Sequence, residues 1–132
     1  MSEAMDERMQ RKGKRSSGES LSQAAKAYIE AHSAEKFSLQ ELSGALYING
    51  SYLLRTFKHQ TGMTLLYYHH SVRCEKAKSL LENTEQSISE IGEAVGFVSS
   101  SHFSHIFRKM ENCTPTEYRM RYRVLTEKTE TV

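Results

Sequence analysis

The chain has 132 residues, which fits one compact domain or two very small ones and excludes a multidomain enzyme. Only one proline and seven glycines interrupt it, so long stretches are free to be helical and we expect an all-α fold. The formal net charge of +2 excludes a diffusely cationic surface as the means of attracting a polyanion, so the positions of the charges matter more than their sum.

The first segment, residues 1–18, is polar and carries mixed charges, with a basic run at 11–15. It lacks the apolar stretch of a secretory signal, so we expect a disordered leader or linker. No apolar run in the chain approaches the roughly 20 residues that a membrane span needs, so we expect no membrane partner. The two cysteines, Cys74 and Cys113, form no recognisable disulfide framework. A reduced, cytoplasmic setting is the simpler expectation.

Helical spacing and capping residues predict three helices in the first half of the chain. Apolar residues one helical turn apart predict the first helix; they are Leu21, Ala24, Ala25, Tyr28 and Ile29. A capping box at 38–41 (Ser-Leu-Gln-Glu) predicts a second helix from Leu39 to about Leu46. After a turn at 48–50, the third helix should run from Ser51 to about Thr61 and end at Gly62. The last two form a helix-turn-helix, with a core predicted from Leu42, Leu46, Leu53 and Phe57.

A long helix is predicted next, from Thr64 to about Glu82, ended by Asn83. Its apolar side would consist of Tyr68, Val72, Ala77, Leu80 and Leu81. About 19 residues at ~1.5 Å per residue give a rod of roughly 28 Å. Successive major-groove segments on one face of B-DNA lie about 34 Å apart. A rod of this length could therefore hold two DNA-reading elements near one helical turn apart, in addition to being a core helix.

The second half of the chain repeats the first. The capping box at 38–41 recurs at 87–90 with an offset of 49 residues, and from Ser51 and Ser101 onward the offset is 50, so the second turn contains one inserted residue. The predicted core of this copy consists of Ile91, Val95, Phe97, Phe103, Ile106, Phe107 and Met110. A third box at 114–117, with Pro at the first helical position, predicts the last helix. A duplicated helix-turn-helix is typical of proteins that read two stretches of DNA.

Basic residues gather at the second helix of each copy and just after it. Residues 50–78 carry a local charge of +4 from Arg55, Lys58, Arg73, Lys76 and Lys78 against Glu75. Residues 99–123 carry a local charge of +3 from Arg108, Lys109, Arg119, Arg121 and Arg123 against Glu111 and Glu117. These clusters are compatible with phosphate binding and equally with ordinary solvated helix faces.

Five stretches, in this order and spacing, resemble the DNA-binding domain of the AraC/XylS transcription regulators. They are 51–58 (SYLLRTFK), 73–81 (RCEKAKSLL), 87–97 (SISEIGEAVGF), 103–109 (FSHIFRK) and 114–119 (TPTEYR). The resemblance implies an all-α fold of seven helices, with two helix-turn-helix units at 19–62 and 84–123, a linker helix at 63–83 and a polar tail at 124–132. It also implies sequence-specific binding to double-stranded DNA without catalysis. RNA polymerase is a candidate second partner, and the effector or dimerisation domain of full-length relatives has no counterpart in this chain.

The resemblance also assigns candidate DNA contacts. Base edges would be read by Ser51, Leu54 and Arg55 in the first unit and by Ser100, Ser101, Ser104 and His105 in the second. Arg55 is the strongest reader, because a guanidinium can bond both acceptors of a guanine. Phosphates would be held by Lys58, Arg108 and Lys109, helped by main-chain amides at the helices that begin at Ser38 and Ser87. Tyr52 and His102 lie beside these faces, and we expect each to pack or face solvent as readily as to contact DNA.

Three departures from the family pattern change details. His105 stands where an arginine is common, and it binds bases more weakly at neutral pH than when protonated. Consecutive serines at 99–101 offer short donors, so the second unit is expected to contribute mostly backbone contacts. Asn112 replaces a glycine and tolerates the same left-handed backbone.

Other functions receive less support from the sequence. His70 and Cys74 have a spacing that can chelate zinc on one helix face, but two ligands do not make a site and we expect no metal or other cofactor. Neighbouring Ser–His pairs at 101–102 and 104–105 lack an acid and an oxyanion loop, so we expect no enzyme. The alternative function is a helical protein-interaction module that does not read DNA directly.

Overall fold

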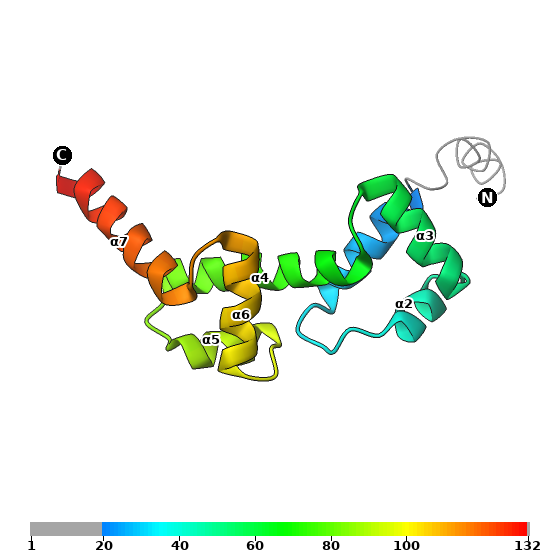
Figure 1. The fold of residues 1–132 in the computed structure, drawn as a ribbon, viewed down its shortest axis with the longest axis horizontal. Coiled ribbons are helices and arrows are strands. Elements are labelled where there is room, and N and C mark those ends of the chain that lie inside the picture. The colour runs from blue at the N-terminus through cyan, green and yellow to red at the C-terminus, as the bar shows by residue number, and fades with distance from the viewer. Residues whose placement is uncertain (1–19, 132) are drawn as a thin grey trace, which may run out of the picture. The chain divides into compact units, whose positions relative to one another are not determined.

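The computed structural model describes residues 20–131, and this part of the chain is helical, with no strand (Figure 1). A first helix covers residues 20–31. It is followed by α2 (Leu39–Ala45), α3 (Gly50–Thr61), α4 (Leu65–Asn83), α5 (Ile88–Val95), α6 (Ser100–Glu111) and α7 (Pro115–Thr131). The expected all-α fold of seven helices is confirmed for the described residues, and the predicted leader at 1–18 lies outside them.

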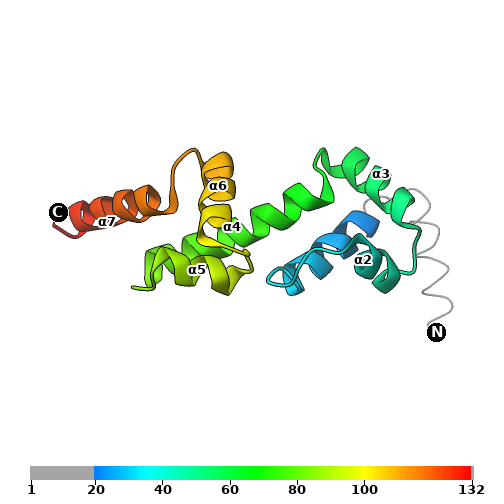
Figure 2. The same ribbon diagram turned by 60° about the horizontal axis from the view of Figure 1, so that its bottom comes forward.

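The described residues divide into two compact units. The first unit contains residues 20–32 and 37–69, and the second contains 33–36 and 70–131. The division falls within α4, whose first turn belongs to the first unit and whose remainder belongs to the second. Each unit holds one helix-turn-helix, α2–α3 in the first and α5–α6 in the second, as Figure 2 shows.

Equivalent caps begin and end the second helix of each helix-turn-helix. Asn49 and Ser99 are the N-caps of α3 and α6, and their side chains accept hydrogen bonds from the main chain three residues later. Gly62 (φ 77°) and Asn112 (φ 65°) are left-handed C-caps, each donating its N–H to a carbonyl four residues earlier at 2.8 Å. A residue with φ in this range ends a helix, which is why glycine and asparagine occupy these positions.

Phenylalanine and aliphatic side chains form the core under each helix-turn-helix. In the first unit Leu42, Leu53 and Phe57 are fully buried, whereas Leu46 is only half-buried. In the second unit the buried cluster contains Ile91, Val95, Phe97, Phe103 and Phe107 from the turn and its two helices, together with Cys74, Ala77 and Leu81 from α4 and Cys113. Ile106 and Met110 pack against this cluster. The predicted core residues of the two helix-turn-helix units are therefore buried, except for Leu46, Ile106 and Met110, which are half-buried at the edge.

Local details differ from the sequence-based expectations in three places. At Ser38 the serine hydroxyl accepts a hydrogen bond from the Glu41 N–H, but the reciprocal bond of the capping box does not form there, unlike at 87–90 and 114–117. Helix α3 begins at Gly50, one residue earlier than predicted, because Asn49 provides the cap. On the first helix Ala24 is exposed and Ser22 is buried, so the predicted apolar stripe is wrong at that position.

Candidate nucleic-acid interface

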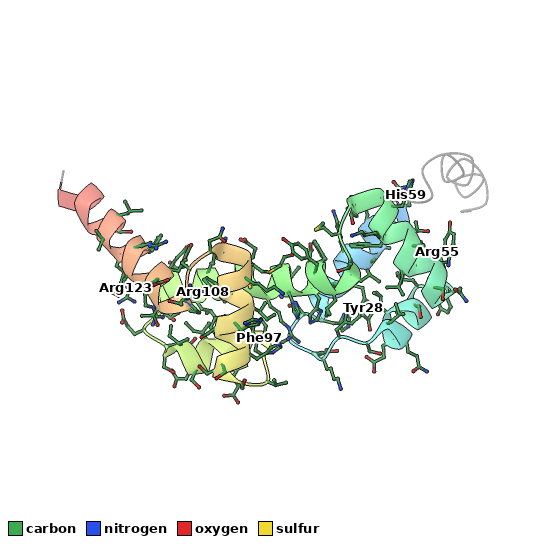
Figure 3. The ribbon with its side chains drawn as sticks, in the orientation of Figure 1. Tyr28, Arg55, His59, Phe97, Arg108 and Arg123 are labelled. Atoms are coloured by element: carbon green, nitrogen blue, oxygen red, sulfur yellow. The ribbon has the colours of Figure 1, made fainter. Side chains whose placement is uncertain are left out.

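Helix α3 presents a solvent-facing surface made of the residues predicted to read DNA. Ser51, Leu54, Arg55 and Lys58 are all exposed, and their spacing of three or four residues places them on one side of the helix. The opposite side is anchored by Leu53 and Phe57, whose side chains are 0% exposed. Figure 3 shows Arg55 and His59 directed away from the neighbouring helices. The buried residues thus hold the helix while its outer face stays open to a ligand.

Helix α6 repeats this arrangement with shorter side chains. Ser100, Ser101, His105 and Arg108 are exposed and Ser104 is half-buried, while Phe103 and Phe107 on the opposite side are 0% exposed. The position equivalent to Arg55 is His105, and the position equivalent to Lys58 is Arg108. The two helices therefore carry the same layout of short polar residues followed by a cation near the C-terminal end. A long cationic side chain at the central position occurs only on α3.

The structure separates the basic residues of the two clusters into two classes. Arg73 donates from Nε to the Ser33 carbonyl (2.6 Å) and from its second terminal nitrogen to the Glu35 carbonyl (2.8 Å). Arg119 donates in the same way to the carbonyls of Leu81 and Thr84, each at 3.1 Å. These guanidinium groups satisfy main-chain acceptors at or just beyond helix ends, where the helix itself leaves carbonyls without partners.

Three further cations of the clusters are engaged within the protein. Arg123 pairs with Glu85 (3.1 Å) and bonds the Thr84 carbonyl, Lys78 pairs with Glu75 (2.8 Å) and Glu111 (3.3 Å), and Lys76 donates to the Ser33 hydroxyl (2.6 Å). The hydrogen bonds to Glu75 and Glu111 raise the pKa of Lys78. By contrast, no hydrogen bond or ion pair among the described side chains, those of residues 20–126, engages five exposed cations of the clusters: Arg55, Lys58, Arg108, Lys109 and Arg121. Four of these five lie on α3 and α6.

Comparison with known proteins tests the resemblance to the AraC/XylS regulators. A family model described as a helix-turn-helix domain matches residues 42–121. The crystal structure of an AraC-type regulator from Chromobacterium violaceum has 31% sequence identity and a TM-score of 0.75, over 81% of this chain and 96% of that one. The chain belongs to the AraC/XylS family. The predicted family is therefore confirmed over both helix-turn-helix units.

Two other relatives of the AraC/XylS chain bear on function. The DNA-binding domain of AdpA, a global transcriptional factor solved in complex with a target DNA, has 28% identity and a TM-score of 0.72 over 79% of this chain and 93% of that one. The transcriptional activator RhaR of Mannheimia succiniciproducens is 37% identical over 67% of this chain and 32% of its own length. The chain spans 32% to 41% of the length of the first curated relatives. The matched proteins are named as transcriptional regulators.

Ser38 and Ser87, at the starts of α2 and α5, cap their helices, so their hydroxyls are already hydrogen-bonded within the protein. In this AraC/XylS domain the Ser87 hydroxyl accepts from the Glu90 N–H (3.0 Å), and the Ser87 N–H donates to the Glu90 carboxylate (2.9 Å). The Ser38 hydroxyl is likewise occupied by the Glu41 N–H (3.1 Å). Any phosphate at these positions would therefore meet the remaining main-chain amides of the first turn rather than the serine hydroxyls.

The sequence left the role of His102 open between packing, solvent exposure and DNA contact. In the structure His102 is a packing residue. Its ring lies edge-on to Phe97 (5.4 Å between centroids) and to His70 (6.2 Å), and its Nδ1 atom is buried without a hydrogen-bond partner. Tyr52, in contrast, is 43% exposed beside the reading face of α3. Figure 3 shows Phe97 between α6 and α4. No local pattern in the sequence could reveal this histidine's role, because its neighbours lie on α4 and in the turn.

Metal and membrane sites have little support in the described part of the AraC/XylS chain. Among the side chains that the structure describes, those of residues 20–126, no group of three or more histidine, cysteine, aspartate or glutamate side chains could hold a metal ion. Burial, chiefly, raises the pKa of the Cys74 thiol to about 12, so this sulfur is a poor thiolate ligand. None of the described helices is long and apolar enough to cross a membrane.

Proposed function

We propose that the chain binds double-stranded DNA sequence-specifically as part of a bacterial-type transcription regulator, with α3 and α6 as its two recognition helices. The observation that carries the proposal is the equivalence of two anchored helices, each with an exposed face and with cations that the protein does not engage. Paired recognition helices with basic ends suit two successive major-groove segments. The regulator would act in the cytoplasm, where a bacterial chromosome lies.

Base edges would be read mainly from α3. The guanidinium of Arg55 can donate two hydrogen bonds to the O6 and N7 atoms of one guanine, and Ser51 can bond any base edge. Leu54 is 41% exposed and offers an apolar contact for a thymine methyl group. On α6, Ser100, Ser101, Ser104 and His105 are short readers, so the second unit would supply less base discrimination than the first.

Phosphates would be held at both recognition helices. Lys58 on α3 and Arg108 and Lys109 on α6 lie at the C-terminal ends of their helices and form no ion pair among the described side chains. The amides after Ser38 and Ser87 would add weaker contacts. The linker helix α4 has the 19 residues expected, which at ~1.5 Å per residue give roughly 28 Å. We propose that the two reading elements occupy adjacent major-groove segments.

RNA polymerase remains a candidate second partner. The exposed apolar residues Leu66 (47%) and Tyr67 (51%) at the start of α4 offer a contact surface for a protein. The same surface is what a protein-interaction module would use, which is the alternative function for the whole chain.

Selection of bound sequences from a random duplex pool, followed by titration of the recovered duplex at several salt concentrations, tests the proposal. We expect an enriched motif with one strong block and a second weaker block, and an affinity that falls steeply with added salt because phosphate contacts release counterions. If the chain retains no duplex even at low salt, it does not bind DNA and the interaction module becomes the better account.

A further inference from the structure

Four aromatic and cationic side chains meet beneath the first turn of α6. The Phe97 ring lies 6.3 Å from the His70 ring and 5.4 Å from the His102 ring, and the Arg73 guanidinium carbon lies 5.2 Å above it. Phe97 itself is 5% exposed. All four residues belong to the second unit. The cluster therefore ties the start of α6 to α4 through two imidazoles and one phenyl ring.

The charges around His70 disfavour a second proton on its ring. Partial burial lowers the pKa of His70, and Arg73 on α4 and His102 and Lys109 on α6 lower it further. Each of these neighbours is a cation when charged, so an imidazolium at His70 would be repelled from both helices. On the adjacent segment 33–36, Glu35 and Lys36 are exposed, and Glu35 meets the cluster through its carbonyl on Arg73.

His102 makes the cluster less tolerant of charge. Its main-chain N–H is fixed by the Ser99 hydroxyl (3.0 Å), so the residue cannot move without disturbing the cap of α6. Its Nδ1 atom is buried and makes no hydrogen bond. If the His70 ring on α4 were protonated, its charge would face the His102 ring across the cluster. The resulting repulsion would be reduced most easily by displacement of the first turn of α6, which carries Ser100 and Ser101.

We propose that His70 is a positioning residue for the second recognition helix: in its neutral form it supports the packing of α6 through Phe97 and His102, and its protonation loosens α6 and weakens DNA binding. The effect on DNA rests on the proposed function, whereas the effect on α6 does not. Because the folded protein disfavours the proton, this support is fully present above the ordinary histidine pKa of 6.5 and is lost as pH falls through the lower folded pKa.

The first test follows amide hydrogen exchange in the whole chain at pH 7.5 and 5.5, corrected for the intrinsic pH dependence of exchange. Wild type is compared with His70→Phe, which keeps an aromatic ring and cannot be protonated, and with His105→Gln, which removes an exposed histidine from the same helix. We expect protection in α6 to fall by about threefold or more on acidification in wild type and in His105→Gln, and to stay constant in His70→Phe. Amides of α3 serve as the internal reference.

Equal loss of protection in His70→Phe and wild type would overturn the proposal, as would constant protection in wild type. If His70→Phe fails to fold, NMR titration of the wild-type His70 ring decides: a midpoint below 6.5 supports the proposal and a midpoint at or above 6.5 overturns it.

A second test measures affinity for the selected duplex at both pH values and constant ionic strength. Protonation of His105 would raise affinity in acid, so the comparison is made between His105→Gln and the double variant His105→Gln/His70→Phe. We expect affinity to fall several-fold in acid for the single variant and to change less for the double variant. Equal pH dependence overturns the link to DNA. Absence of any duplex binding, with the exchange result intact, would refute the proposed function and leave the positioning role of His70 standing.

Discussion

At the scale of single residues, some arginines of this domain are hydrogen-bonded to main-chain carbonyls and others are exposed to solvent. Arg73 and Arg119 are each bonded to two main-chain carbonyls, whereas Arg55, Arg108 and Arg121 are exposed and make no hydrogen bond or ion pair with the side chains described up to residue 126. A bonded guanidinium stabilises the fold, because its removal takes a hydrogen-bond donor away from each carbonyl. An exposed one is available to DNA.

Arg119→Met and Arg121→Met, two residues apart on α7, test this division. We expect Arg119→Met to lower the free energy of unfolding by about 1–3 kcal/mol, since the Leu81 carbonyl loses its side-chain donor and the Thr84 carbonyl keeps only Arg123. Arg121→Met should change it by no more than about 0.5 kcal/mol. Urea unfolding monitored by circular dichroism measures both. Equal effects of the two substitutions would contradict a structural role for Arg119.

The role of Arg55 as a base reader makes a separate prediction. Arg55→Ala should weaken binding to the selected duplex by about 1–3 kcal/mol and relax the base preference at one position, because a bidentate contact to guanine is lost. Binding titrations on the selected duplex and on its single-base variants measure both effects.

Lys58→Ala, one turn further along α3, is the matched control for Arg55→Ala. It should weaken binding to all duplexes alike and lower the slope of log affinity against log salt by roughly one, because one phosphate contact is lost. If Arg55→Ala behaved in this way instead, Arg55 would be a phosphate contact.

At the scale of elements, the turn between α5 and α6 tolerates no side chain at its glycine. Gly96 has φ 110°, and a Cβ built there would lie 2.6 Å from the Ala34 carbonyl oxygen. Gly44, in the last turn of α2, has nothing within 4 Å of the same position. The equivalent of Gly96 in the first unit is Tyr47, which adopts φ 55° and is 95% exposed. The first turn is therefore open where the second is packed.

Gly96→Ala and Gly44→Ala should have opposite effects on stability. Gly96→Ala combines an unfavourable left-handed backbone with a main-chain clash, so we expect a loss of more than about 2 kcal/mol. Gly44→Ala should stabilise by roughly 0.5–1 kcal/mol, because alanine is the better helix former. Thermal unfolding compares the two variants. A neutral Gly96→Ala would show that this turn is not packed as described.

Helix α7 is joined to α4 by a hydrogen bond from the hydroxyl of Tyr118, which should be lost at alkaline pH. Tyr118 donates a hydrogen bond to the Glu82 carboxylate, and burial together with this carboxylate raises the pKa of Tyr118 to about 12. Because the folded pKa is raised, the stabilisation is complete below the ordinary value of 10 and is lost as pH rises toward 12.

Tyr118→Phe removes that pH dependence. The variant should be less stable than wild type at pH 8, and the difference in free energy of unfolding should shrink as pH rises from 10 to 12. Urea unfolding at stepwise pH values measures the difference. A difference that stays constant over this range would show that the Tyr118 hydroxyl does not titrate with the raised pKa.

Local signals predicted the elements better than they predicted the contacts between them. Capping boxes, the proline at 115 and the left-handed Asn112 act within a few residues, so the predicted helix starts and stops lie within about one residue of those in the structure. The bonds of Arg73 and Arg119 join residues 35 to 40 positions apart. No periodicity marks such partners, which is why these arginines were grouped with the candidate phosphate contacts in the local charge counts.

At the scale of the whole molecule, the two copies found in the sequence also share the same arrangement of buried and exposed side chains. Both recognition helices bury two phenylalanine or leucine anchors and expose a cation near their ends, yet they differ at the central reading position, Arg55 in one and His105 in the other. This difference predicts unequal contributions to specificity from two helices of similar geometry. The exposure of these residues follows from the structure, while their contacts with DNA are proposals.

Hydroxyl-radical footprinting of the selected duplex at low ionic strength tests most directly whether two recognition helices read one side of the double helix. We predict two protected segments whose centres lie about 10 base pairs apart, on the same face, with the stronger base preference in only one of them. A footprint with no protection, with a single segment, or with segments on opposite faces would contradict the account.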